Sequence, residues 1–290
     1  MIQYKFDAIG TSWQIDIGHD VSLKTENELR DAIRARIDEF DRVYSRFRSD
    51  SLVMHAAENP GIYELPSDAK AMLMLYHALY KRTGGMFTPL VGDILDSAGY
   101  DSTYSLSEKG DVKPAVLWED AIEYSFPNIQ IKQKGILDFG AAGKGYLVDI
   151  VADLIRSYGF TDFIVDAGGD ICHSGKEKIR VGLEHPYNPN EAIGVALIGN
   201  ASICGSATNR RVWGTWNHVI NPKTAKSAED IVAVWTIAGS TLLADALSTC
   251  LFFVSPETLS DVYDFEYVLV KKDMSVIYSK GFSGELFVRA

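Results

Sequence analysis

The chain has 290 residues, of which 47% are hydrophobic and 23% are charged. This balance is typical of a globular protein with a sizeable core, and it excludes a disordered chain, a collagen and a coiled coil. The 28 Lys and Arg residues are outnumbered by 39 Asp and Glu, and a net charge of −11 offers no basic surface to nucleic acid.

The cysteines and the amino terminus both favour a reducing, cytoplasmic compartment. Cys172, Cys204 and Cys250 are an odd number without C-x-x-C spacing, so we expect neither a disulfide framework nor a zinc site. Residues 1–7 lack the charged and apolar regions of a secretory signal. The most apolar window, 231–254, is split by a Gly-Ser-Thr turn, so we expect no membrane segment.

The first elements are predicted to be a hairpin and a long helix. Apolar residues alternate over 4–17 on both sides of a Gly-Thr turn, which predicts two paired strands. A capping box of Thr25 and Glu28 predicts the start of a helix that ends near Arg48. The core-facing stripe of this helix would be Leu29, Ile33, Ile37, Phe40, Tyr44 and Phe47.

The rest of the chain is predicted to mix helices with many strands. A helix is expected from Ser67 to the glycine pair 84–85, an extended segment over 124–139 and a helix over 144–158. Strands are predicted over 163–166, 179–183, 193–198, 218–220, 231–237, 267–270, 276–278 and 286–288. Because helices interrupt the strands without alternating with them, we expect an α+β architecture. No linker marks a boundary, so residues 1–290 are expected to form one two-lobed domain.

Asp245 is the one charged residue between Asp230 and Glu257, within an apolar strand and helix. A buried unpaired carboxylate is costly, so this side chain needs a cation, a set of backbone donors or a changed pKa. Thr249 lies four positions later, on the same helix face. Carboxylate and hydroxyl oxygens suit a hard cation such as Mg²⁺ or Ca²⁺. Two interpretations stay open: a metal ligand, or the cap of a helix that begins near Ser240.

Residues 137–146, which read Leu-Asp-Phe-Gly-Ala-Ala-Gly-Lys-Gly-Tyr, are typical of a strand end, a loop of small residues and a helix start. Small residues let a backbone approach a ligand, and a helix amino terminus favours negative charge. The segment is not a P-loop, because Asp138 stands where a glycine is needed and Gly145 where a hydroxyl is needed. A phosphate-binding loop and a plain tight turn both remain open.

Seven segments, taken in order, resemble the FAD:protein FMN transferase family, also called ApbE. They are Ile9-Gly10-Thr11, Tyr44-Ser45-Arg46-Phe47, 83–92, 137–146, 168–171, 218–224 and 244–249. The resemblance covers nearly the whole chain. It implies a T-fold-like, two-lobed α+β domain with mixed or antiparallel sheets, which holds FAD in its cleft with Mg²⁺ beside the pyrophosphate.

The resemblance also implies roles for individual residues. Asp245 and Thr249 match the side-chain metal ligands, and Ala141 matches a position that offers a backbone carbonyl. Flavin-contact positions match Ile9, Met86, Phe87, Thr88, Asp138, Lys144 and Ile220. His218 matches a histidine that assists catalysis, and through its metal Asp245 would also be catalytic.

The implied reaction joins FMN through a phosphoester to a Ser or Thr hydroxyl of an acceptor protein and releases AMP. Mg²⁺ would neutralise the pyrophosphate, and His218 would orient or deprotonate the hydroxyl. The chain departs from the family pattern at Thr88, over 204–210 and over 221–225. A flavin-binding or FAD-hydrolysing relative that does not modify proteins is therefore the alternative.

A serine hydrolase of the penicillin-binding type is a third interpretation. Residues 67–70 fit the pattern S-x-x-K, and 223–225 approximate K-T-G. Ser67 follows Pro66, however, where a helix N-cap is expected, and the sequence has no S-D-N element.

Overall fold

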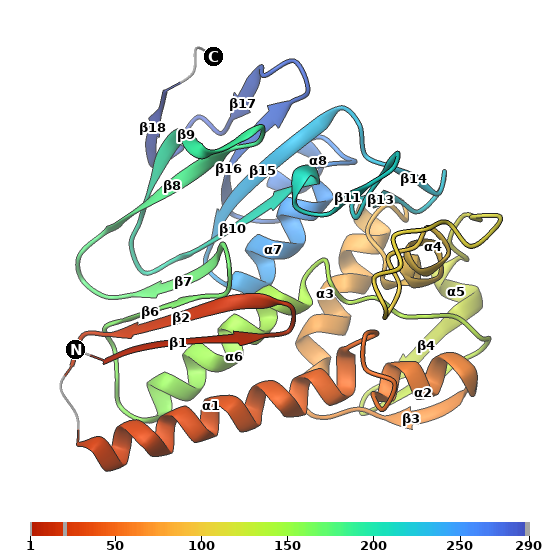
Figure 1. The fold of residues 1–290 in the computed structure, drawn as a ribbon, viewed down its shortest axis with the longest axis horizontal. Coiled ribbons are helices and arrows are strands. Elements are labelled where there is room, and N and C mark those ends of the chain that lie inside the picture. The colour runs from red at the N-terminus through yellow and green to blue at the C-terminus, as the bar shows by residue number, and fades with distance from the viewer. Residues whose placement is uncertain (1, 20–21, 288–290) are drawn as a thin grey trace.

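A computed structural model of the chain describes residues 2–19 and 22–287. Its largest element is an eight-stranded sheet in the order β1-β2-β6-β7-β10-β15-β16-β17 (Figure 1). These strands are β1 (Ile2–Ala8), β2 (Thr11–Ile17), β6 (Phe163–Asp166), β7 (Asp170–Ser174), β10 (Ser202–Ala207), β15 (Ile231–Ala238), β16 (Phe265–Lys271) and β17 (Val276–Tyr278). Neighbouring strands of the sheet pair antiparallel.

Smaller sheets extend this framework. One joins β18 (Gly284–Leu286), β9 (Asn188–Ile198) and β8 (Ile179–His185), and another joins β3 (Gly61–Glu64), β5 (Asn128–Ile131) and β4 (Ile122–Ser125). Two short hairpins pair β11 (Val212–Trp213) with β12 (Trp216–Asn217), and β13 (Ile220–Asn221) with β14 (Lys226–Ser227).

The helices are interspersed among these strands, so the predicted α+β class is confirmed. They are α1 (Leu23–Tyr44), α2 (Leu52–Glu58), α3 (Ala69–Arg82), α4 (Gly92–Ser97), α5 (Trp118–Ala121), α6 (Gly143–Ser157), α7 (Thr241–Cys250) and α8 (Glu257–Ser260), with 3₁₀ turns η1 (Pro89–Val91) and η2 (Thr208–Arg210). None of the helices within the described ranges is both long and apolar enough to cross a membrane.

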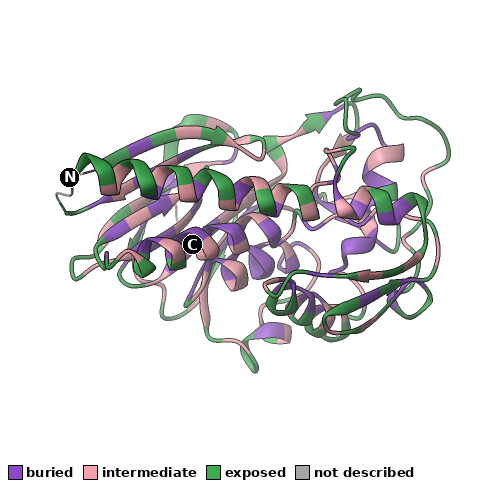
Figure 2. Cartoon of the chain, turned by 90° about the horizontal axis from the view of Figure 1, so that it is seen from below, coloured by how far each residue is buried: buried purple, intermediate pink, exposed green. Residues whose placement is uncertain are grey.

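Helix α1 shows how the hydrophobic pattern sets the fold, and where the predicted boundaries were wrong. Its buried residues are Leu29, Ile33, Ile37, Phe40 and Tyr44, while its other face is exposed and turned toward the viewer in Figure 2. The cap is Ser22, whose hydroxyl accepts the N–H of Thr25 over 3.2 Å, and not Thr25 itself. The helix ends at Tyr44, before the predicted Arg48, so Phe47 lies outside it.

Other differences follow from weak local signals. Helix α2 and strand β3 were not predicted, and the extended segment 124–139 forms the end of a β4–β5 hairpin and a loop. The predicted strand 218–220 is present only as β13, so His218 lies in a bend. The last predicted strand ends at Leu286, and Val288 lies outside the described residues.

Helices α6 and α7 pack against each other and place the candidate site. On α6, Leu147, Val148, Val151 and Ile155 are fully buried, and each such side chain contributes about 1.5–3 kcal/mol through burial. The two helices approach so closely that a Cβ atom at Gly145 would lie 2.4 Å from the carbonyl oxygen of Thr241. Only glycine fits this contact without a shift of the backbone.

Candidate functional site

The amino termini of α6 and α7 are capped reciprocally. The carboxylate of Asp149, on α6, accepts the N–H groups of Thr241 and Leu242 over 2.9 and 2.8 Å. In return, Asp245 on α7 accepts the N–H of Gly145 over 2.9 Å. Each carboxylate therefore satisfies donors that the partner helix cannot satisfy internally.

The interpretation of Asp245 as the cap of its own helix is wrong. Ser240 holds that position, and its hydroxyl accepts the N–H of Leu243 over 3.3 Å. Asp245 lies in the second turn, is 4% exposed and accepts a hydrogen bond from the first turn of α6. Its surroundings thus supply one backbone donor and leave capacity for a cation.

Half-buried Lys144 and buried Asp170 form an ion pair beside Asp245. The Lys144 ammonium lies 2.5 Å from the Asp170 carboxylate, and Asp170 is 1% exposed at the start of β7. Burial opposes the charge on Lys144, but the Asp170 and Asp245 carboxylates together raise the pKa of Lys144 above its usual value. Lys144 was a predicted flavin contact, whereas no role was predicted for Asp170.

Burial is also the largest influence on the pKa of Asp245. It raises the pKa of Asp245 well above the ordinary aspartate value, and the neighbouring Asp170 raises it further. Lys144 and the Gly145 N–H act in the opposite direction. A divalent cation would favour the ionised carboxylate by the same Coulombic effect.

The other predicted metal ligands lie on α7 or directly before α6, the two helices that the bond between Asp245 and Gly145 joins. Thr249 follows one turn later and is half-buried, whereas the adjacent Ser248 is fully buried and hydrogen-bonds to the carbonyl of Asp245 and to Ser206. Ala141 lies in the turn directly before α6. Hydroxyl, carboxylate and carbonyl oxygens are the donors that Mg²⁺ prefers, so the set fits a hard cation.

This composition differs from a metal cage of several acids. Over residues 2–19 and 22–287, no group of three or more His, Cys, Asp or Glu side chains is arranged to hold a metal ion. A site with one or two carboxylates leaves coordination positions for a ligand's phosphate oxygens, as is usual for Mg²⁺.

Asp138 is fixed by Arg46, a residue to which the sequence analysis gave no role. Arg46 Nε donates to Asp138, and the other Asp138 oxygen accepts the N–H of Gly140 over 2.7 Å. Arg46 is 5% exposed and also donates to the carbonyl of Tyr100 over 2.7 Å. The sequence contains one signal for this role: Arg46 is a charged residue directly before Phe47, the last residue of the predicted apolar stripe.

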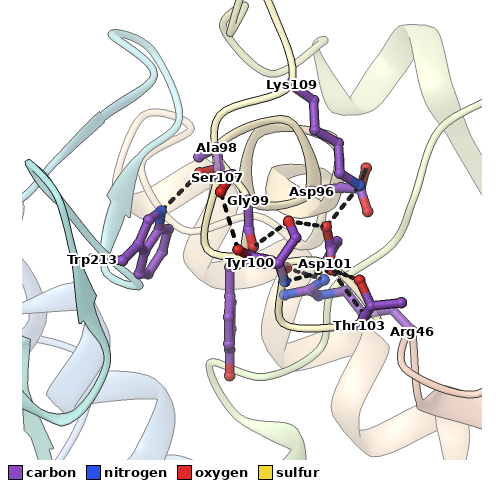
Figure 3. A network of polar contacts seen from close by, with 11 residues as sticks. Arg46, Asp96, Ala98, Gly99, Tyr100, Asp101, Thr103, Ser107, Lys109 and Trp213 are labelled. Carbon is purple, nitrogen blue, oxygen red and sulfur yellow. Dashed lines mark hydrogen bonds and ion pairs between the residues drawn. The ribbon is translucent and has the colours of Figure 1, made fainter.

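The loop that contains Tyr100 is held by a polar network around Asp101 (Figure 3). Asp101 is 3% exposed and accepts hydrogen bonds from Thr103 and Ser105, and Lys109 lies 2.9 Å from its carboxylate. These donors hold the pKa of Asp101 far below its usual range, Ser105 contributing most. Trp213 Nε1 donates to the carbonyl of Ala98 over 2.7 Å and fastens the loop to the β11–β12 hairpin.

His218 lies near the charged groups of the site. Burial lowers the pKa of His218 to about 4, and the Arg211 guanidinium lowers it as well. The charges of Asp138 and Lys144 act on the same ring. Its Nδ1 atom has no hydrogen-bond partner within the described part of the chain. The imidazole is therefore neutral at pH 7, with one buried nitrogen unpaired among the described residues.

The turn at Ile9 lies beside Arg211. Ile9 has a φ of +44°, which is unusual for a β-branched residue, and Gly10 has a φ of +75°. The Arg211 guanidinium lies 3.4 Å from the Gly10 carbonyl and over the rings of Tyr100 and Tyr104. Strained backbone of this kind often occurs at ligand sites.

The loop 86–88 and Ile220 use their side chains for packing. Phe87 is 2% exposed and stacks on Tyr76 at 4.7 Å, and the Thr88 hydroxyl accepts the N–H of Leu90 over 3.2 Å. Ile220 is buried in β13, and Met86 is half-buried. Phe87 and Thr88 could therefore meet a flavin mainly through their backbone.

Known proteins are similar to this chain over most of its length. The model of the ApbE family matches residues 9–268. The FAD:protein FMN transferase of Escherichia coli (strain K12) is 25% identical over 276 residues, covering 88% of this chain and 78% of that protein. A protein of the same name from Klebsiella pneumoniae (strain 342) is 24% identical and covers 91% and 83%.

Solved structures show the same fold. The ApbE protein from Thermotoga maritima superposes with a TM-score of 0.85 at 19% identity, over 96% of this chain and 97% of that one. The flavin transferase ApbE from Vibrio cholerae superposes with a TM-score of 0.80 at 18% identity, over 97% of both chains.

Proposed function

Because the chain belongs to the ApbE family, we propose that it is an FAD:protein FMN transferase, which moves FMN from FAD to a Ser or Thr hydroxyl of an acceptor protein in an Mg²⁺-dependent reaction. In this reaction the hydroxyl oxygen forms a bond to the FMN phosphorus. The bond between that phosphorus and the bridging oxygen of the pyrophosphate breaks, and AMP leaves. The hydroxyl proton passes to a base.

The observation that carries the proposal is the convergence of Asp245 on the amino terminus of α6. The Asp245 carboxylate, the loop of small residues over 140–143 and Lys144 meet where α6 begins. Backbone N–H groups and an ammonium at this point suit a pyrophosphate. Asp245, Thr249 and the Ala141 carbonyl would hold Mg²⁺, which when bound supplies positive charge to the phosphate oxygens.

His218 is the candidate base. Its pKa of about 4 keeps the ring neutral at pH 7, and Nδ1, which is buried and has no partner among the described residues, would receive the hydroxyl proton once the acceptor reaches it. Asp138 and Ile9 are proposed flavin contacts, and Asp138 is held in place by Arg46. In phosphoryl-type transfer such positioning supplies most of the catalysis.

Mass spectrometry tests this function. The protein is incubated with FAD, Mg²⁺ and peptides that carry Ser or Thr in an acidic context, and we expect a covalent mass increase of one FMN. The matched control replaces the acceptor hydroxyl by alanine in the same peptide. Absence of an adduct on all peptides, with FAD bound, would contradict transfer.

A flavin-binding or FAD-hydrolysing relative is the second candidate, and the segment 221–225 favours it. The residue at the last position, Ala225, has a φ of +52°, in the region where glycine is at ease. In the departing segment 204–210, Ser206 hydrogen-bonds to Ser248 of α7 over 2.7 Å, whereas Arg210 pairs with Glu184 at 3.0 Å. Release of AMP without any acceptor, measured by chromatography, would support this candidate. The cytoplasmic location stays a prediction.

A further inference from the structure

Asp170 is delivered into the protein interior by a specific turn. Gly168 and Gly169 have φ values of +69° and +104°, and the N–H of Gly169 donates to Asp166 over 2.9 Å. A Cβ atom at Gly168 would lie 2.1 Å from the hydroxyl oxygen of Thr11. The turn therefore requires glycine, and it starts β7 with a carboxylate facing α6 and α7.

This carboxylate is unusually poor in partners. Asp170 is 1% exposed, and apart from the ion pair with Lys144 neither of its oxygens has a hydrogen-bond donor among the residues that the structure describes. Buried carboxylates are normally saturated with donors because their desolvation is expensive. Asp170 thus has one positive partner, Lys144, and lies against the carboxyl group of Asp245.

Asp170 also faces a second carboxyl group, that of Asp245. Both residues are buried and act on each other, and Lys144 is the cation that acts on both. A single ammonium therefore serves two carboxyl groups that lie in contact. If Lys144 turns toward a nucleotide phosphate, both carboxylates lose their cation, and a divalent ion would replace it.

We propose that Asp170 is a further acidic residue of the metal centre, and that it holds the divalent cation together with Asp245, directly or through one water. The inference rests on the proposed function, since it assumes that a divalent ion binds beside Asp245. Under this inference, Asp170 binds the cation in addition to neutralising the charge of Lys144.

A double-mutant cycle separates these two tasks. Mn²⁺ binding in the presence of FAD is measured by electron paramagnetic resonance for the unchanged protein, Asp170→Asn, Lys144→Gln and the double variant. If Asp170 serves the cation, Asp170→Asn weakens Mn²⁺ binding at least about tenfold both alone and in the Lys144→Gln background. If Asp170 only neutralises Lys144, the loss disappears once Lys144 is removed, and the inference is overturned.

Asp149→Asn is the matched control, because it removes one half-buried carboxylate, which lies on α6 and caps α7. We expect it to change Mn²⁺ binding less than about threefold, so a loss equal to that of Asp170→Asn would also overturn the inference. Asp170→Asn alone leaves the Lys144 ammonium without its partner and could misfold for that reason. The double variant has no ammonium at this place, so its comparison with Lys144→Gln still tests the role of Asp170. Failure of the unchanged protein to bind Mn²⁺ with FAD would instead contradict the proposed metal-dependent function.

Discussion

The N–H of Gly145 donates to the Asp245 carboxylate over 2.9 Å, although the two residues are 100 positions apart in the chain. This bond joins the first turn of α6 to the second turn of α7. It also explains why a carboxylate can stand alone in an apolar stretch of sequence, because the donor comes from a distant helix.

Gly145→Ala tests the close approach of the two helices. The added methyl group would lie 2.4 Å from the Thr241 carbonyl oxygen and 2.6 Å from Asp245 Cβ. We expect the free energy of unfolding to fall by about 3 kcal/mol, measured by urea denaturation. Gly239→Ala is the control, since nothing lies within 4 Å of its added Cβ, and it should change stability by less than about 1 kcal/mol.

Asp245→Asn separates the structural bond from the proposed metal contact. The Asn oxygen can still accept the Gly145 N–H, so the melting temperature should stay within a few degrees. Loss of the charged ligand should lower FMN transfer at least about 100-fold, as expected when several kcal/mol of charge stabilisation are removed. Transfer at the original rate, measured by adduct formation, would refute the ligand assignment.

The low pKa of His218 gives two expectations at acid pH. The unfolded chain binds a proton at its histidine below about pH 6.5, whereas folded His218 does so only below about pH 4. Stability is therefore lost as pH falls through this window, and His218→Gln should reduce that loss by about 2 kcal/mol. The measurement is urea denaturation of both proteins at pH 7 and pH 4.5.

If His218 is the base, the acid limb of kcat/KM should lie nearer pH 4 than pH 6.5. An acid limb at pH 6.5 that persists in His218→Gln would show that another group controls the rate. Asn217→Ser alters the neighbouring position and should leave the position of the limb unchanged.

Arg46→Met tests the buried pair that fixes Asp138. The substitution keeps most of the side-chain volume but leaves the Asp138 carboxylate without its cation, at an expected cost of about 3–5 kcal/mol. FAD affinity, followed by flavin fluorescence, should fall with it. Arg42→Met removes an exposed pair with Asp38 and should cost no more than about 1 kcal/mol. An equal loss of stability in the two variants would show that the buried Arg46–Asp138 pair stabilises the protein no more than an exposed pair does.

The sequence predicted those parts of the fold that have strong periodicity. The stripe of α1, the hairpin at 4–17 and strand β6 depend on local alternation and came close to their observed bounds. Strands β7 and β10 were missed because both contain small or polar residues whose burial is decided by neighbouring strands. The cap of α1 was misassigned because Ser22 and Thr25 both fit the capping pattern.

The sequence also predicted only part of the site, because the remaining part depends on contacts between distant segments. Asp245 could be singled out because it is a lone charge in an apolar segment. Asp170, Arg46 and Asp149 could not, since their importance comes from partners 26, 92 and 92 positions away, which no local pattern encodes. Lys144, the partner of Asp170, lies 26 positions before it in the chain.

The exchange of carboxylates between α6 and α7 ties ligand affinity to assembly of the whole chain. Neither an amino-terminal fragment that ends before residue 240 nor the complementary carboxyl-terminal fragment contains both sides of the centre. The free energy of ligand binding at this centre would therefore also favour association of the two halves of the chain. Mixed fragments cut in the segment 228–230 should reassemble more readily when nucleotide and divalent salt are added.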